Sequence, residues 1–424
     1  MTRLDTKPVR TDGLRGYVLP LARATTARAA TFASVDVVTQ LTMSELGASR
    51  FLVSVCSSLA WAGITLFSVF WGTLSDALRM RKRTVIVAGL LSTLMVFVPL
   101  MFQSLASLLV GRFLIEAFGA GVPPAILALL SERARPGHRA QRISVFTTAQ
   151  AGGILAGMSL GGFLFAKLTT RGAYAAIASL SGITVLSSLL LPRERRASGA
   201  GALQASPWSG FAEGLGAFTR RFKAVSSFGL VYLYTGIAIR KAGVTGFFGL
   251  LQVYLREGVG LGPQFASSLT AINPLAQAAL MGLVAHGSDR LGHRRFFLSG
   301  YLLTTIAPLT LCLFGSVWLI GLAFLISGLS FALFISGTTG YIGDLASDDV
   351  QAGLMGMMKT SQGIGGIVGP FVAGILSLPS ALGFGGMFLA MAILIACGFL
   401  ITVLGSKPEP LRDGNARDRL PQSR

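Results

Sequence analysis

Long apolar segments recur along the whole chain, each close to the length of about 20 residues that a helix needs to span a bilayer. Eleven segments are clear and predict helices over 49–73, 84–104, 105–130, 143–168, 173–192, 227–255, 262–286, 296–315, 316–344, 352–378 and 383–404. A twelfth segment, 17–42, is interrupted by Arg23, Arg28 and Asp36. The pattern predicts an all-α membrane protein.

An internal repeat supports the twelfth helix. A shift of 212 residues, half of the 424-residue chain, superposes identical residues: Arg28 on Arg240, Gln40 on Gln252, Glu45 on Glu257, Gly153 on Gly365 and Gly157 on Gly369. Residues 1–212 and 213–424 therefore look like two copies of one six-helix unit. The clear segment 227–255 is then the counterpart of the interrupted segment 17–42, and we predict twelve transmembrane helices in two pseudo-symmetric bundles.

Polar stretches divide the predicted helices into domains. The stretch between the halves is rich in Pro, Gly, Ser and Arg, which is typical of a linker, and the C-terminal stretch has a composition typical of disorder. The predicted divisions are an N-tail (1–16), an N-terminal six-helix bundle (17–192), a linker (193–226), a C-terminal six-helix bundle (227–404) and a C-tail (405–424).

The composition agrees with a bilayer location and the charge distribution orients the chain. Only 12% of the residues are charged, against about 25% in soluble proteins. With both termini on one side, twenty-six Lys and Arg fall on that side, and only Arg50, Lys167, Arg171 and Arg256 fall on the other. The positive-inside rule then places the termini, the linker and the tails in the cytoplasm. We expect a multi-pass protein of the plasma membrane (the cell inner membrane), and its net charge of +19 reflects topology instead of a nucleic-acid partner.

The three cysteines do not form a recognisable site. Cys56, Cys312 and Cys397 lie singly in apolar runs, without a CxxC or Cys/His pattern. Neither a disulfide framework nor a metal site is predicted, and no cofactor is expected.

Two loops carry related motifs. Gly72-Thr-Leu-Ser-Asp76 with Arg81 follows the second predicted helix, and Ser-Asp289-Arg290-Leu-Gly292 follows the eighth. Both resemble the signature loop of the major facilitator superfamily, a Gly-x-Leu-x-Asp-Arg-x-Gly-Arg-Arg pattern present in each half. The resemblance implies a cytoplasmic gate formed by Gly72, Asp76, Arg81, Arg139, Asp289, Arg290 and Gly292. The copies depart from the pattern at Ala77, Arg79, Ala285 and Gly287, and a plain positive-inside hairpin is the alternative interpretation.

The fourth predicted helix contains two charges four residues apart. Its sequence Gly111-Arg112-Phe-Leu-Ile-Glu116-Ala-Phe-Gly119 resembles the superfamily's second motif, which is associated with proton-coupled carriers. Arg112 and Glu116 share a helix face and can pair. Because each charge at mid-membrane costs about 2.5–3.5 kcal/mol on insertion scales, such residues usually line a cavity. A purely structural ion pair is the alternative.

Small residues also recur at spacings of four, including Gly153 and Gly157 in one predicted helix and Gly365 and Gly369 in another. The Gly369-Pro370 pair resembles an antiporter signature, although that signature belongs in the fifth helix, where this chain has Met158. Tight packing of helices is the simpler interpretation of these glycines.

Further polar residues follow the first and seventh predicted helices. In the superfamily fold, helices 1, 4, 7 and 10 line a central cavity, and the charged residues fall on three of these four. We predict a cavity lined by Arg28, Phe32, Gln40, Arg112, Arg240, Lys241, Phe248 and Gln252, with Asp36 or Glu116 as the proton-coupling site. Snorkelling of Arg28, Arg240 and Lys241 towards the cytoplasm is the alternative.

These features together predict a secondary active transporter that moves a small solute by alternating access. Proton-coupled export of a small organic compound, possibly an anion, by a monomer is the favoured function, with the lipid bilayer, the solute and H⁺ as partners. Proton-coupled import of an organic anion and a non-transporting receptor on a carrier fold are the alternatives. A membrane-embedded enzyme is not expected, because no His lies at mid-membrane to serve as a base.

Overall fold

The computed structural model describes residues 12–78, 80–132, 139–191, 230–345 and 348–405, and all regular structure in these ranges is helical. The N-terminal half contains α1 (Asp12–Glu45), α2 (Arg50–Leu78), α3 (Arg81–Met101), α4 (Leu105–Gly119), α5 (Val122–Glu132), α6 (Arg139–Lys167) and α7 (Thr170–Leu189). The C-terminal half contains α9 (Val231–Phe248), α10 (Leu251–Glu257), α11 (Pro263–Thr270), α12 (Ile272–Leu291), α13 (His293–Leu303), α14 (Ile306–Leu313), α15 (Val317–Leu345), α16 (Asp348–Leu376) and α17 (Gly383–Gly405). The prediction of an all-α fold is confirmed.

Several of the predicted helices are divided into two pieces, and proline explains three of the divisions. A proline has no N–H and its ring clashes with the carbonyl four residues earlier. Pro123 and Pro124 accordingly follow the break between α4 and α5, Pro274 follows that between α11 and α12, and Pro308 follows that between α13 and α14. The break between α9 and α10 has no proline and lies at Gly249–Leu250.

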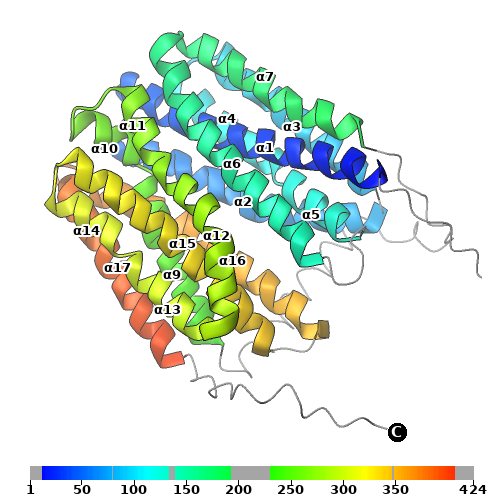
Figure 1. The fold of residues 1–424 in the computed structure, drawn as a ribbon. Helices are drawn as coiled ribbons and strands as arrows, with labels where there is room; N and C mark the ends of the chain where they lie inside the picture. Colours follow the sequence, from blue (N-terminus) through cyan, green and yellow to red (C-terminus); the bar gives the residue numbers. More distant parts are fainter. Residues whose placement is uncertain (1–11, 79, 133–138, 192–229, 346–347, 406–424) are drawn as a thin grey trace, which may run out of the picture.

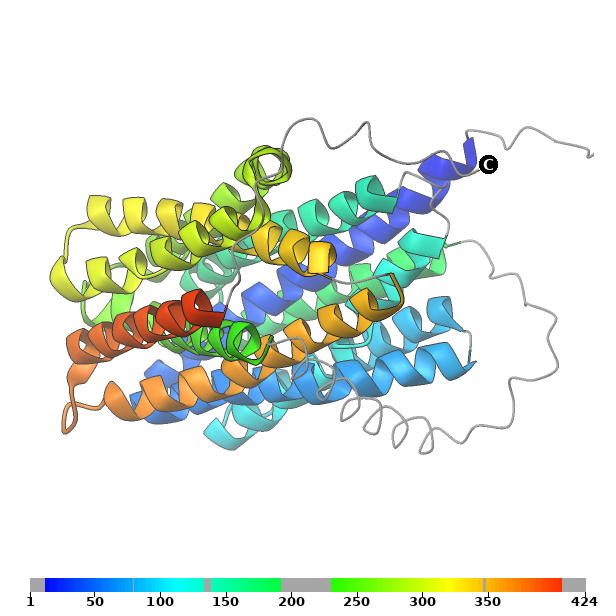
Figure 2. The same cartoon turned by 90° about the horizontal axis from the view of Figure 1, so that it is seen from below.

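The helices lie side by side in two groups that follow the halves of the sequence. Figure 1 shows the blue-to-green helices of the N-terminal half on one side and the yellow-green-to-red helices of the C-terminal half on the other. Figure 2 shows the same helices from a second direction, running along one common long axis. Nine helices or consecutive helix pairs in the described residues are long and apolar enough to cross a membrane. The count of twelve spans stays a prediction.

Glycine contacts reveal the repeat in three dimensions. A Cβ at Gly153 would overlap the carbonyl oxygen of Thr26, and a Cβ at Gly365 would overlap that of Ala238. These contacts are related by the same shift of 212 residues, which maps Thr26 on Ala238 and Gly153 on Gly365. The same holds for Gly157 against Ala30 and Gly369 against Ala242. The recurring glycines therefore bring α6 onto α1 and α16 onto α9.

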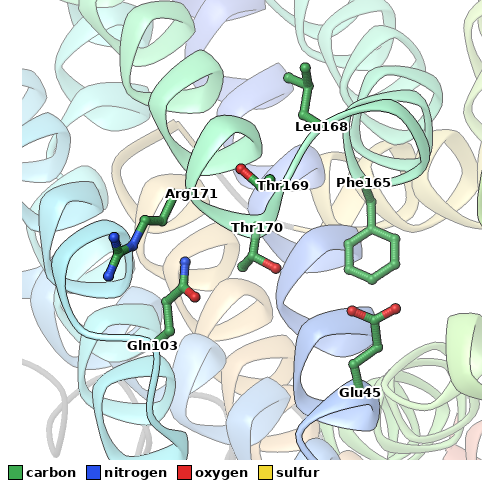
Figure 3. A pocket seen from close by; sticks show the side chains of 7 residues that line it. All are labelled: Glu45, Gln103, Phe165, Leu168, Thr169, Thr170 and Arg171. Atoms are coloured by element: carbon green, nitrogen blue, oxygen red, sulfur yellow. The ribbon is translucent and has the colours of Figure 1, made fainter.

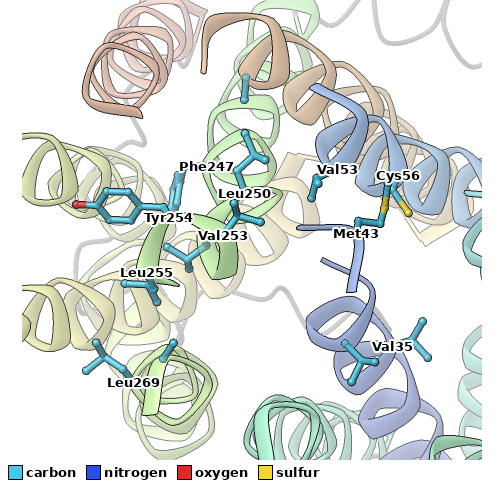
Figure 4. Packing of buried hydrophobic residues seen from close by; sticks show 14 of the residues in the cluster. Val35, Met43, Val53, Cys56, Phe247, Leu250, Val253, Tyr254, Leu255 and Leu269 are labelled. Carbon is cyan, nitrogen blue, oxygen red and sulfur yellow. The ribbon is translucent and has the colours of Figure 1, made fainter. Parts of the chain in front are cut away.

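The two halves are joined through an apolar core. One cluster of buried side chains contains Met43, Val53 and Cys56 of the N-terminal half together with Phe247 and Leu250 of the C-terminal half. Figure 4 shows these side chains between the surrounding helices. Glycine again permits close contact, because a Cβ at Gly162 would meet Ser267 and one at Gly374 would meet Ser54. Each half thus packs α6 or α16 against the other half.

The predicted linker 193–226 lies outside the described residues, as do most of the N-tail and nearly all of the C-tail. The helix α1 begins at Asp12, five residues before the predicted start at 17. The other predicted domain divisions stay predictions.

Candidate functional site: an ion cluster between α1 and α4

Four charged side chains meet in the N-terminal half, and we call Arg28, Asp36, Arg112 and Glu116 the ion cluster. Arg28 Nη2 lies 2.6 Å from Glu116 Oε2, and Arg112 Nη1 lies 3.2 Å from Glu116 Oε1. Arg112 Nη2 lies 2.9 Å from Asp36 Oδ1. The structure therefore brings together the predicted charges of the first and fourth helices, and two positive charges balance two negative ones.

The backbone of both helices completes the cluster. Arg28 Nε donates to the carbonyl oxygen of Gly119 (3.3 Å), and Arg112 Nη1 donates to that of Phe32 (3.3 Å). The guanidinium of Arg112 also lies 5.1 Å from the ring centroid of Phe32. A Cβ at position 119 would overlap the guanidinium of Arg28, so the motif glycine makes room for the arginine.

The two carboxylates differ in their access to solvent. The side chain of Glu116 is 0% exposed and that of Arg112 is 2% exposed, whereas that of Asp36 is 34% exposed. Asp36, Gln40 and Arg112 line a narrow crevice, together with Thr39, Met43, Val53, Cys56 and Ser57. Asp36 is therefore the member of the cluster that can exchange a proton without prior movement of the arginines.

A pair of repeat-related glutamines connects the cluster to the other half. Gln40 Nε2 donates to Asp36 Oδ2 (2.9 Å), and Gln40 Oε1 accepts from the backbone N–H of Gln252 (3.4 Å). The Gln252 side chain is in turn held by Thr270 (3.1 Å) and Ser267 (3.3 Å) of α11. A continuous chain of hydrogen bonds thus runs from Asp36 in one half to α11 in the other.

Arg240 differs from the prediction, because its contacts lie inside the C-terminal half. Its side chain is buried, its Nε donates to Thr304 Oγ1 (3.0 Å), and its guanidinium lies 3.8 Å from the ring centroid of Phe334. The repeat explains the difference, since the counterpart of Glu116 at position 328 is glycine. Arg240 therefore has no repeat-equivalent carboxylate and does not join the ion cluster.

Phe248 also reflects this loss of charge. Phe248 and Phe324 are the repeat counterparts of Asp36 and Arg112, and their ring centroids lie 6.5 Å apart. An aromatic contact in the C-terminal half thus occupies the position of an ion pair in the N-terminal half.

Lys241 lies at the contact between the halves. Its Nζ is 3.9 Å from the ring centroid of Trp61 on α2. Trp61 in turn meets Phe32 edge-on, with ring centroids 6.5 Å apart. No carboxylate among the described residues lies within ion-pair distance of Lys241. The prediction that Lys241 faces the cluster side is compatible with this placement, although Trp61 was missed.

The predicted loop residues lie at the helix ends where α2 approaches α3 and α12 approaches α13. Gly292 has φ +98° and ends α12, which explains the glycine in the motif. Asp289 and Arg290 are exposed, and Gly72 has open space at its Cβ position. Arg81 begins α3, while the side chains of Asp76 and Arg139 lie outside the described set.

Sequence reasoning missed a group of ion pairs at the opposite end of the molecule, where α1 joins α2 and α10 joins α11; we call this the distal end. Glu45 Oε1 lies 3.1 Å from Arg256 Nη2, and Glu257 Oε2 lies 3.6 Å from Arg50 Nη2. Ser44 Oγ also donates to Glu257 Oε1 (2.8 Å). All three contacts join the two halves. The signal was present, because Glu45 and Glu257 are repeat counterparts and both arginines belong to the few basic residues on that side.

The largest pocket found in the described residues also lies at the distal end. Its volume is about 600 Å³, and Figure 3 shows the side chains that line it: Glu45, Gln103, Phe165, Leu168, Thr169, Thr170 and Arg171. All seven belong to the N-terminal half, so this pocket is separate from the crevice at the ion cluster. Among the described side chains, no group of three or more His, Cys, Asp and Glu gathers in a way that could hold a metal ion.

Comparison with solved structures supports the same fold. The nucleoside transporter NupG matches with a TM-score of 0.73 at 15% identity, covering 92% of this chain and 99% of that one. A bacterial homolog of the human lysosomal transporter Spinster, in an inward-facing and occupied conformation, matches at 0.72 and 14%, covering 92% and 96%. The human organic anion transporter MFSD10 matches at 0.64 and 17%, covering 92% and 99%. These identities show the fold alone.

Sequence comparisons identify the family. An uncharacterized MFS-type transporter of Methanocaldococcus jannaschii is 30% identical over 89 residues, which is 21% of this chain and 22% of that protein. The matched part therefore spans about a fifth of the relative's length. The model of the Major Facilitator Superfamily matches residues 23–240 and 233–423, which together cover most of the sequence. The chain belongs to the Major Facilitator Superfamily, a family of multi-pass membrane transporters of small solutes.

Proposed function

We propose that this protein is a proton-coupled secondary transporter that exports a small organic anion across the plasma membrane. It acts as a monomer with both termini in the cytoplasm, and its two bundles, 17–192 and 227–404, alternate around a central site. The observation that carries the proposal is Asp36, a partly exposed carboxylate that is paired to Arg112 and linked through Gln40 to the other half.

Protonation of Asp36 is the coupling step. The charged group facing Asp36 is Arg112 of α4, with Glu116 behind it, while Gln40 and Cys56 are its uncharged neighbours. A proton on Oδ1 removes the negative charge that holds Arg112 and weakens the hydrogen bond through which Gln40 is oriented. Because Gln40 contacts the backbone of Gln252, this local change alters the contact between the halves.

Alternating access requires a closed side that can open. The distal ion pairs Glu45–Arg256 and Arg50–Glu257 join the halves in this structure, and this arrangement supports a state closed at the distal, extracellular end. The loop residues Asp76, Asp289 and their basic neighbours form the opposite, cytoplasmic gate when the distal end opens.

Proteoliposomes containing only this protein test the proposal. Vesicles are loaded with each member of a panel of small organic anions, and efflux is measured with and without an inward proton gradient. We expect efflux of at least one anion to accelerate with the gradient, and Asp36→Asn to abolish the acceleration. Asp344→Asn is the matched control, since Asp344 is an exposed carboxylate on α15 outside the cluster.

Other outcomes contradict defined parts of the proposal. Accumulation of the anion along the direction of proton flow would make the protein an importer. Gradient-dependent efflux in the Asp36→Asn variant would exclude Asp36 as the proton site. Specific binding of a panel anion without any flux would favour a receptor on a carrier fold.

A further inference from the structure

A row of cationic and aromatic side chains crosses from the N-terminal half to the C-terminal half. The guanidinium of Arg112 lies 5.1 Å from the ring centroid of Phe32, which lies 6.5 Å from that of Trp61. The ring of Trp61 is covered by Nζ of Lys241 at 3.9 Å. Four helices, α4, α1, α2 and α9, contribute one residue each. The row therefore forms part of the contact that must change when the halves move.

The two ends of the row differ in charge balance. Arg112 is bound by both Asp36 and Glu116, so its charge is compensated. Lys241 contacts the ring of Trp61 and has no carboxylate within ion-pair distance among the described residues. Lys359 of α16 is close enough for the two ammonium groups to repel each other. The C-terminal end of the row thus has uncompensated positive charge.

Two cations beside each other inside a membrane protein are unfavourable unless an anion accompanies them. A solute with an acid group between Lys241 and Lys359 would relieve their repulsion and form charge-assisted hydrogen bonds. The ion cluster cannot supply this charge, since both of its carboxylates are already paired with arginines.

The surroundings of Trp61 favour a flat ring on the same solute. A Cβ at Gly366 would overlap the indole, and a Cβ at Gly363 would overlap Thr65 one turn further along α2. Glycine at these positions of α16 leaves aromatic surface at the contact between the halves. Aromatic rings prefer to stack with an offset or to meet edge-on, and both geometries are open to a solute beside Trp61 and Phe32.

We propose that the transported solute is a planar aromatic anion whose acid group binds Lys241 and Lys359 and whose ring packs against Trp61 and Phe32. This inference rests on the proposed transport function and gives the class of its substrate. Lys359 and Trp61 become binding residues, and Arg240 is a structural residue of the C-terminal half.

Calorimetric titration of the full-length protein in detergent tests this site without requiring flux. The probe is naphthalenesulfonate, because a sulfonate stays ionised at all working pH values and its binding does not report protonation. Cyclohexanesulfonate has the charge without the aromatic ring, and naphthylmethylammonium has the ring with the opposite charge. We expect naphthalenesulfonate to bind at least about tenfold more tightly than either.

Variants locate the site. Lys241→Gln and Lys359→Gln should each weaken naphthalenesulfonate about tenfold or more, and Trp61→Leu should weaken it more than it weakens cyclohexanesulfonate. Lys241→Arg keeps the charge and should stay within about threefold of the parent. Lys167→Gln, a change of an exposed lysine at the end of α6, is the matched control and should have no effect.

The inference is overturned if naphthalenesulfonate binds no better than naphthylmethylammonium, or if both glutamine variants bind as the parent does. Proton-gradient-driven flux that persists in Lys241→Gln would also overturn it while leaving the transport function intact. Lysine-dependent binding in a protein that moves no anion would refute transport and retain the binding site. Elution and thermal midpoint of each variant show whether it is folded.

Discussion

Glu116 offers the most direct measure of how much the ion cluster contributes to stability. Its carboxylate is fully buried and lies between two guanidiniums, 2.6 Å from Arg28 and 3.2 Å from Arg112. Glu116→Gln preserves the size and removes the charge. The variant leaves Arg28 and Arg112 facing Asp36 alone, so the cluster changes from neutral to a net charge of one.

The expected loss follows from the burial. Removing one partner of a buried ion pair destabilises a protein by about 3–5 kcal/mol, because the remaining charge is left uncompensated. The entropy of unfolding is about 2.1 cal/mol/K per residue, or about 0.4 kcal/mol/K for a cooperative unit of about 200 residues. The thermal midpoint should therefore fall by about 7–12 °C if the N-terminal half unfolds as one unit, and by about half as much if the whole chain does.

Thermal unfolding of purified variants in one detergent measures this loss. The comparison variant is Asp36→Asn, whose side chain is 34% exposed and makes one ion pair. Solvent screening reduces its expected effect to about 1 kcal/mol. The double variant Arg28→Gln with Glu116→Gln restores neutrality, and we expect it to be more stable than Glu116→Gln alone.

Two results would refute the reasoning. A midpoint for Glu116→Gln within about 2 °C of the parent would mean that the buried charge is not required for stability. Additive losses in the double variant would mean that Arg28 and Glu116 do not interact energetically, since residues in direct contact show coupling of about 0.5–3 kcal/mol.

Three further predictions concern other contacts. Exchanging the charges of the exposed distal pair (Glu45→Arg with Arg256→Glu) should preserve transport, whereas Arg256→Glu alone should shift the equilibrium between conformations by no more than about tenfold, as measured by cysteine accessibility at the distal end; equal behaviour of both variants would exclude a direct pair. Gly153→Ala should lower the thermal midpoint because its Cβ would overlap α1, whereas its neighbour Gly152→Ala meets nothing within 4 Å and should not; equal midpoints would contradict the packing argument. Gln40→Ala should weaken the coupling of proton and solute fluxes more than it changes the thermal midpoint, and unchanged stoichiometry of flux would exclude the glutamine link.

The fold could be predicted from the sequence because the bilayer imposes strong requirements on it. Apolar runs of spanning length give the helices, and the shift of 212 residues gives the pairing of α6 with α1 and of α16 with α9. The divisions within helices were not anticipated, although Pro124, Pro274 and Pro308 mark three of them. A hydropathy pattern does not register a missing backbone hydrogen bond, because it depends on side chains alone.

The ion cluster was predictable for a local reason, whereas other contacts depend on packing between distant segments. Spacings of four residues place Arg28 and Asp36 on one face of α1, and Arg112 and Glu116 on one face of α4. Charges that cannot face lipid must find each other across these faces. Arg240 obeys the same rule but is satisfied by Thr304 and Phe334, residues whose types give no sign of this role in a sequence.

The comparison of the halves explains why the site is asymmetric although the backbone is repeated. Close helix contacts need glycine at fixed positions in both copies, so Gly153 and Gly365 retain equivalent contacts. The charges were not subject to that steric requirement, and the C-terminal counterparts of Asp36 and Arg112 are Phe248 and Phe324.

A neutral, internally paired cluster in one half therefore faces a half whose cations have lost their carboxylates. Protons can act on the first half, because Asp36 is partly exposed. An anion can act on the second half, because Lys241 and Lys359 repel each other. The two ligands then affect different halves through one contact between Gln40 and Gln252, and reciprocal linkage requires each ligand to change the affinity for the other. Coupling follows from the divergence of the repeats, since two identical halves would have given both ligands the same site.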